Sequence, residues 1–137
     1  YKRQVFQSLP NPVNVLTTHS AWLMSSLVMG ANGLLSGAGS VIAPLQVRLF
    51  NAIKNNNLKE AKDINDKIFP LVQLFYKPPF LDMHNRMKET LVILNAMKKA
   101  VVRPPLMKLP FEEIEELKNT VNDINLDNKL NFVKLVV

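Results

Sequence analysis

Two short apolar segments near the start of the chain, separated by one helical run, constrain its fold more than any other feature. Residues 13–17 are rich in β-branched side chains, the pattern of a buried strand. Residues 21–29 are apolar on nearly every side, with Ser20 as a candidate N-cap and Gly30 as the expected stop of a helix. Residues 34–36 form the second candidate strand.

A strand, a helix, a glycine turn and a second strand together make the βαβ pattern, which implies parallel strands and a right-handed crossover. Parallel sheets need cover on both faces, and two strands do not provide it. The sequence therefore predicts an α/β fold whose other strands lie outside this chain. The first residue is Tyr rather than Met, which also suggests that part of the protein is missing upstream.

The remainder of the chain has the pattern of helices. Residues 2–9 fit the end of one helix, and Pro44 suits the first turn of another that continues to a loop at 55–57. The next helix contains Pro70, which predicts a kink. Breaks follow at 77–79 and 101–105, while the tail 125–137 fits either a frayed helix or an added strand. The apolar positions that mark the three later helices are Ala61, Ile64, Ile68, Val72 and Phe75, then Phe80, Met83, Met87, Leu91 and Leu94, then Phe111, Ile114, Leu117, Val121 and Ile124.

Composition excludes several classes of function. The chain has no cysteine, so disulfides and thiolate chemistry are absent, and this fits a cytoplasmic protein. The net charge is +6, but the lysines are scattered among acids without interleaved aromatics, which argues against nucleic-acid binding. No apolar run reaches the roughly 18 residues of a membrane span. His19 and His84 are the only histidines and no carboxylates have ligand spacing near them, so no metal site is expected.

Five segments, in this order and spacing, resemble the dihydrodipicolinate synthase and N-acetylneuraminate lyase family of Class I aldolases. Residues 13–20 and 29–44 resemble strands seven and eight of its (β/α)8 TIM barrel, although Ser40 stands where the family often has Asn. Residues 61–65 are similar to its helix nine, and residues 79–89 and 102–106 to later turns and helix starts.

The resemblance implies an α/β fold in two parts. Residues 1–55 would be the end of the barrel, comprising the end of helix six, strand seven, helix seven, strand eight and helix eight. Residues 56–137 would be a C-terminal helical extension. The implied partners are the remaining N-terminal part of the barrel and further copies in a homo-oligomer, a tetramer or a dimer.

The resemblance also implies a lyase or synthase that joins a lysine to the keto group of pyruvate or a related 2-keto acid as a Schiff base. The protonated imine then accepts electrons when a C–C bond next to it forms or breaks. The family needs no cofactor for this step. Its lysine ends strand six, upstream of this chain, and Lys2 falls on helix six, so no catalytic residue is expected here.

The rim of the substrate pocket is the part of the site that this chain is expected to supply, because barrel active sites lie at the C-terminal ends of the strands. The candidate substrate-binding residues are Thr18, His19, Ser20, Ser36 and Gly37. Thr18 replaces a glycine of the family, Ser20 replaces an acid, and Ala21 stands where sialic-acid lyases place Glu. These departures argue against a sialic-acid substrate, and they also weaken a strict assignment to the synthases.

Each candidate also has a simpler structural interpretation. Thr18 and Ser36 suit caps and turns, and Gly37 suits a tight turn or, less simply, an anion site. Asp82 and Arg86 are spaced i, i+4 and are expected to pair on the surface. Trp22 and the methionines are expected in the core or in subunit contacts.

For the chain as a whole, the alternative hypothesis is an independent helical interaction module without catalytic activity. Such a module would have no need of two buried strands.

Overall fold

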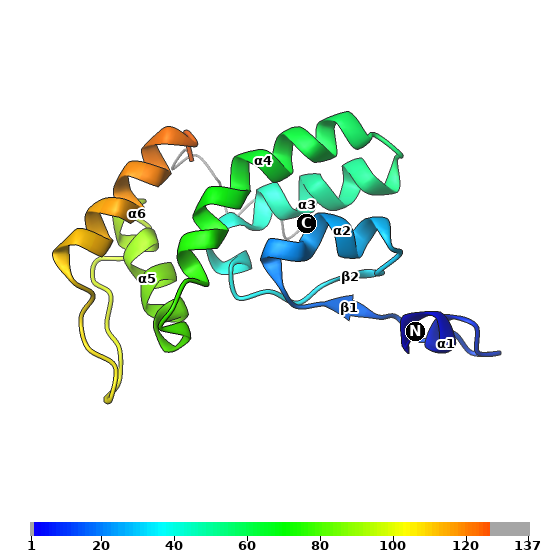
Figure 1. Cartoon of the computed structure of the whole chain (residues 1–137), viewed down its shortest axis with the longest axis horizontal. Coiled ribbons are helices and arrows are strands. Elements are labelled where there is room, and N and C mark those ends of the chain that lie inside the picture. Colours follow the sequence, from blue (N-terminus) through cyan, green and yellow to red (C-terminus); the bar gives the residue numbers. More distant parts are fainter. Residues whose placement is uncertain (1, 127–137) are drawn as a thin grey trace.

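The described part of the chain is mainly helical, with one parallel strand pair along one side of the helices (Figure 1). The structure is a computed structural model and describes residues 2–126. The elements in chain order are α1 (Lys2–Gln7), β1 (Leu16–Thr17), η1 (Ser20–Trp22), α2 (Leu23–Val28), β2 (Gly33–Leu34), α3 (Gly39–Lys54), α4 (Leu58–Phe75), η2 (Phe80–Asp82), α5 (Met83–Ile93) and α6 (Phe111–Asp123). No helix in this range is long and apolar enough to cross a membrane.

The βαβ unit is present as the sequence predicts. β1 and β2 pair in parallel, with Leu16 opposite Gly33 and Thr17 opposite Leu34. Gly30 follows α2 with a φ of +93°, a left-handed conformation that glycine adopts without strain. The strands are shorter than predicted. Part of the reason lies at Val15, whose N–H bonds to a side chain, the Asn32 Oδ1 at 2.9 Å, instead of continuing the ladder.

Ser20 was expected to cap the helix after β1, and that prediction is wrong. The chain turns through the short helix η1 first, and no side chain caps either η1 or α2. Ser20 is itself the first residue of η1 and is only 3% exposed. Its hydroxyl bonds to other side chains, described below.

The helix α3 begins earlier than its proline predicts. It starts at Gly39 and is interrupted at Ile42, whose φ of −119° and ψ of 23° are not helical. Pro44 therefore lies in the first turn after the interruption, which is where a proline fits a helix. In α4, the helix runs through Pro70 as one element. Pro70 and Asp66, whose carbonyl lacks its helical partner, are both exposed, so water can solvate that carbonyl.

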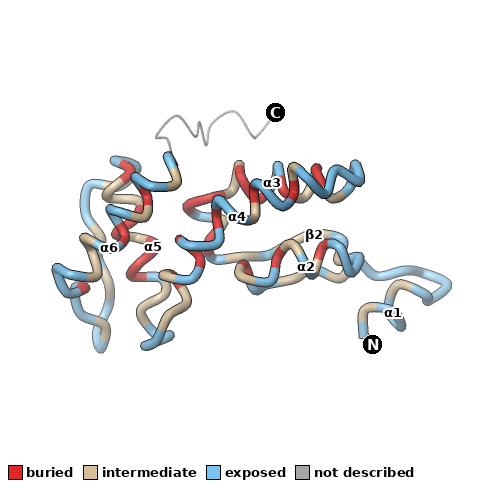
Figure 2. Tube along the Cα trace, turned by 45° about the horizontal axis from the view of Figure 1, so that its top comes forward, coloured by how far each residue is buried: buried red, intermediate tan, exposed pale blue. Residues whose placement is uncertain are grey.

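The core lies where α3 and α4 pack side by side, with α2 and α5 against them (Figures 1 and 2). The predicted stripe on α4 is confirmed, because all five of its members are buried: Ala61, Ile64, Ile68, Val72 and Phe75. The stripe on α6 is confirmed at Leu117 and Val121, but Phe111 is 71% exposed. Trp22 is 65% exposed, so its expected place in the core is wrong; a subunit contact stays a prediction.

Candidate functional site

Two serines meet at the carboxyl ends of the parallel strands. Ser20 comes three residues after β1, and Ser36 comes two residues after β2. The carboxyl ends of parallel strands lie at the same edge of a sheet, so these side chains are brought together. The hydroxyls of Ser20 and Ser36 form a short hydrogen bond.

Two further side chains, from helices, complete the group. The Gln46 Nε2 on α3 donates to the Ser36 Oγ at 3.2 Å, and Gln46 is only 2% exposed. The Tyr76 hydroxyl, from the residue that ends α4, lies 3.4 Å from the Ser20 Oγ. We call Ser20, Ser36, Gln46 and Tyr76 the hydroxyl cluster. Ser36 and Tyr76 remain half-buried, so the cluster is reachable from one side.

The remaining predicted residues lie around this cluster to different degrees. His19 is exposed, and its ring centroid lies 5.2 Å from that of Tyr76. Gly37 follows Ser36 and is exposed; a Cβ there would meet Met87 at an ordinary 3.5 Å, so lack of space does not require a glycine. Thr18 is exposed, and its side chain makes no hydrogen bond with any residue in the range 2–126.

A buried arginine holds the turn that carries Tyr76. Arg86 is fully buried, and its Nε donates to the Glu113 Oε2 at 2.9 Å. Its other nitrogens donate to backbone carbonyls at the end of α4 and in the turn after it: Phe75 at 3.4 Å, Lys77 at 2.6 Å, Pro78 at 3.3 Å and Pro79 at 3.3 Å. The last carbonyls of a helix lack helical partners and carry partial negative charge, which the guanidinium satisfies.

The expected surface pair of Asp82 and Arg86 is therefore wrong. Asp82 accepts a hydrogen bond from Asn85 at 3.3 Å, while Arg86 points inward to Glu113 and the turn. Adjacent carbonyls and a carboxylate offer the five guanidinium donors more partners than one exposed aspartate can.

Gln46 and Tyr76 were not among the residues predicted from the sequence, and Arg86 was predicted only as a surface partner of Asp82. Gln46 had a signal, because it is a lone polar residue in the apolar run 41–47. Tyr76 had no signal in local spacing, since it lies 56 positions from Ser20.

The chemistry open to the hydroxyl cluster is hydrogen bonding. Three hydroxyls and one amide can donate to or accept from a substrate oxygen, but none of them is charged. No group of three or more metal-ligating side chains occurs within residues 2–126. The cluster can therefore orient a ligand, while a nucleophile would have to come from elsewhere.

Comparison with known proteins identifies the family and the fold of the chain. The model of a family described as the dihydrodipicolinate synthetase family matches residues 2–124. A search of curated protein sequences gives no match.

Solved structures of similar fold belong to the same group. They include a monomeric dihydrodipicolinate synthase variant (TM-score 0.81, 18% identity, 90% of this chain and 40% of that one). The dihydrodipicolinate synthase from Aquifex aeolicus gives a TM-score of 0.75 at 19% identity, over 93% of this chain and 42% of its own. A prophage protein of the same family from E. coli, in complex with pyruvate, gives 0.73 at 21% identity, over 82% and 37%. The chain thus spans about two fifths of the length of these structures.

Proposed function

Because the chain belongs to the dihydrodipicolinate synthetase family, we propose that it is the C-terminal part of a Schiff-base-forming lyase or synthase. β1 and β2 are then strands seven and eight of a (β/α)8 barrel. In this proposal residues 1–55 close the barrel and residues 56–137 are its helical extension, of which 127–137, with most of the tail 125–137, lie outside the described residues. The parallel pairing of β1 with β2 supports this placement. The alternative, an independent helical interaction module, does not account for a parallel strand pair.

The observation that carries the proposal is the hydroxyl cluster at the carboxyl ends of the two strands. In barrels of this kind the substrate lies at those ends. Ser36 and Ser20, supported by Gln46 and Tyr76, would orient an oxygen of the substrate. Thr18, His19 and Gly37 would line the same opening.

The proposed substrate is pyruvate or a related 2-keto acid, which one relative of similar fold binds. A lysine outside this chain attacks the keto carbon, and loss of water leaves an imine whose protonated form accepts electrons from the neighbouring bond. No cofactor is needed. The protein would act in the cytoplasm as a homo-oligomer, completed by the N-terminal strands of its barrel.

Reductive trapping tests this proposal directly. Borohydride reduces an imine to a stable amine, so full-length protein treated with pyruvate and borohydride should gain the mass of the reduced adduct on one lysine. Peptide mapping should place that lysine outside residues 1–137. The matched control is lactate, which has no keto group and should leave no adduct. Absence of labelling with every 2-keto acid tried, or labelling of a lysine within this chain, would refute the proposal.

A further inference from the structure

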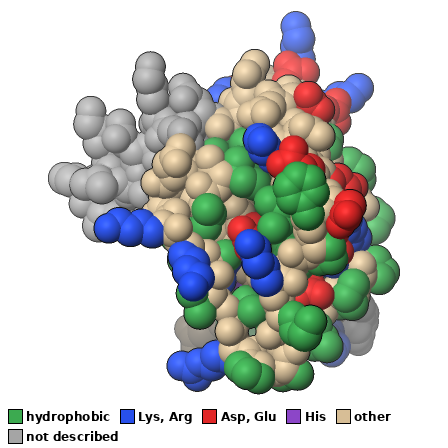
Figure 3. All heavy atoms as spheres, turned by 90° about the vertical axis from the view of Figure 1, so that its left-hand side faces the viewer, with side chains coloured by type: hydrophobic (Ala, Val, Ile, Leu, Met, Phe, Trp, Pro, Cys, Tyr) green, Lys and Arg blue, Asp and Glu red, His purple; other side chains and the backbone are tan. Residues whose placement is uncertain are grey.

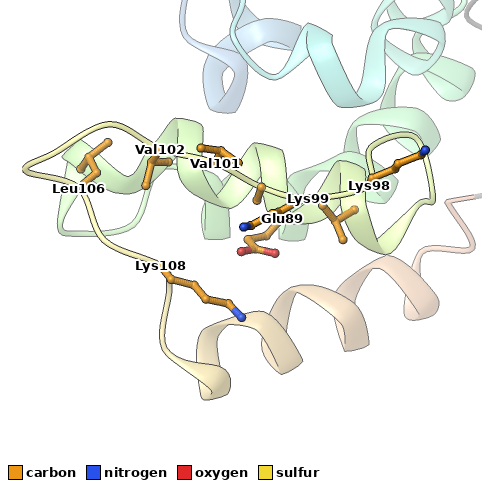
Figure 4. A pocket seen from close by; sticks show the side chains of 9 residues that line it. Glu89, Lys98, Lys99, Val101, Val102, Leu106 and Lys108 are labelled. Carbon is orange, nitrogen blue, oxygen red and sulfur yellow. The ribbon is translucent and has the colours of Figure 1, made fainter.

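A second pocket lies on the helical extension, on different elements from the hydroxyl cluster. It has a volume of about 450 Å³ and is enclosed by α5 and by the two sides of the link 98–108 (Figure 4). Its lining residues are Glu89, Val92, Lys98, Lys99, Ala100, Val101, Val102, Leu106 and Lys108. None of these belongs to the proposed active site.

Glu89 gives the pocket a negative group at its base. It is only 7% exposed, and within residues 2–126 its carboxylate takes part in no hydrogen bond or ion pair. Figure 4 shows this carboxylate pointing into the space between Lys99 and Lys108. Within residues 2–126 no buried side-chain oxygen or nitrogen lacks a hydrogen-bond partner, so the Glu89 carboxylate keeps contact with solvent through the pocket and is open there to a donor or a cation.

Positive groups surround the mouth. Lys98, Lys99 and Lys108 are exposed, and none of them comes within ion-pair distance of an acid in the described part of the chain. Lys88 is already engaged, since its Nζ donates to the Val101 carbonyl at 2.6 Å and fixes the link against α5. With one carboxylate and three free ammonium groups, the pocket has an excess of positive charge at its rim.

The walls between these groups are apolar. Val92 from α5 lines the pocket together with Val102 and Leu106 from the link. On the molecular surface, lysine and arginine side chains lie among hydrophobic and acidic ones over the face that includes α5 and α6 (Figure 3). A ligand for this pocket therefore needs a cation, an anion and a short hydrocarbon part.

We propose that this pocket binds a free aliphatic α-amino acid. Its ammonium group would pair with Glu89 and its carboxylate with Lys99 and Lys108, while its side chain packs on Val92 and Leu106. A simple amine could pair with Glu89 but would offer no negative charge to the rim lysines. A simple acid could pair with the lysines but would offer no positive charge to Glu89. Only a zwitterion satisfies both signs of charge.

Calorimetric titration of the full-length protein with leucine and two analogues tests the site without any mutation. Leucine should bind with a Kd below about 1 mM. 4-Methylpentanoate, which lacks the ammonium group, and 3-methylbutylamine, which lacks the carboxylate, should each bind roughly 10- to 100-fold more weakly, the loss expected for one charged hydrogen bond. Equal binding of all three compounds, or no binding of leucine, would overturn the proposal.

Variants then assign the contacts. Glu89→Gln keeps the shape of the side chain and should remove the preference for leucine over 4-methylpentanoate. Lys99→Ala with Lys108→Ala should remove the preference over 3-methylbutylamine. Asp63→Asn with Lys62→Ala, on the exposed face of α4, is the matched control and should leave both preferences intact. Preferences that survive in both pocket variants would show that leucine binds elsewhere. Since the site does not involve the imine, trapping with pyruvate should proceed in all variants.

Discussion

Ser36 occupies the centre of the hydroxyl cluster, where it bonds to both Ser20 and Gln46. In the proposed enzyme, Ser36→Ala would remove one neutral hydrogen bond to the substrate, a loss of about 0.5–1.5 kcal/mol, or up to about tenfold in rate. We expect turnover to fall by that factor, while trapping with pyruvate and borohydride survives because the lysine is elsewhere. Steady-state kinetics and mass spectrometry measure the two effects.

Ser25→Ala is the control for that variant, since the Ser25 hydroxyl bonds only to the Trp22 carbonyl on an exposed surface. It should leave turnover unchanged. Loss of trapping in a folded Ser36→Ala protein would show that Ser36 acts in imine formation. Unchanged turnover would show that Ser36 has only a structural role in the turn.

At this scale the sequence located the serines but not their partners. Ser20 and Ser36 follow from strand polarity, because a residue just after a parallel strand lies at the active edge. Gln46 and Tyr76 depend on how α3 and α4 pack, which local spacing does not encode. The i, i+4 rule also misplaced Arg86, because exposed ion pairs contribute little and the orphan carbonyls of the turn offer more.

Arg86 joins three elements, since it ties α5 to the end of α4 and to Glu113 on α6. Arg86→Ala would leave several carbonyls without a partner, and the partly buried Glu113 carboxylate would keep only its pair with Lys77 at 4.0 Å. We expect the free energy of unfolding to fall by about 3 kcal/mol, as for a broken buried pair. Urea denaturation of the full-length protein measures this change.

Arg48→Ala is the matched control on the surface. Arg48 pairs with Glu60 at 3.4 Å, but its side chain is 61% exposed. Exposed pairs contribute about 0–1 kcal/mol, so the free energy of unfolding of this variant should lie within about 1 kcal/mol of that of the parent. Equal losses in the two variants would contradict the role assigned to Arg86.

The helices were predictable because their stripes are long and regular, as α4 shows. The start of α3 was not, because a short helical turn at Gly39 precedes the interruption at Ile42 and only the segment after Pro44 has a regular pattern. The strands were found but predicted too long, since side chains such as Asn32 compete for the backbone of residues 13–17.

The molecule as a whole exposes apolar surface around its sheet. Leu16, Leu35 and Val13 are 49%, 71% and 51% exposed, and α1 has no buried residue (Figure 2). If these residues close a barrel, residues 1–137 expressed alone should aggregate or form a molten globule that binds a hydrophobic dye. A monomer of residues 1–137 with a cooperative unfolding transition would rule this out.

The sequence indicated that partner strands are needed, since two parallel strands cannot cover themselves. The sequence did not indicate which side chains are exposed when the partner strands are absent. Trp22 was assigned to the core or to subunit contacts from its residue type alone, whereas the path of η1 decides that it points outward.

The connection between α3 and α4 has a consequence for the order of folding. Only residues 55–57 separate the two helices, so their packing closes a short loop, and the entropic cost of closure is low. Contacts between neighbours in sequence form early, while strand pairing across a barrel waits for distant segments. We expect amides of α3 and α4 to gain protection first in pulse-labelled hydrogen exchange during refolding. The helical hairpin would then be the surface on which the last two strands are assembled.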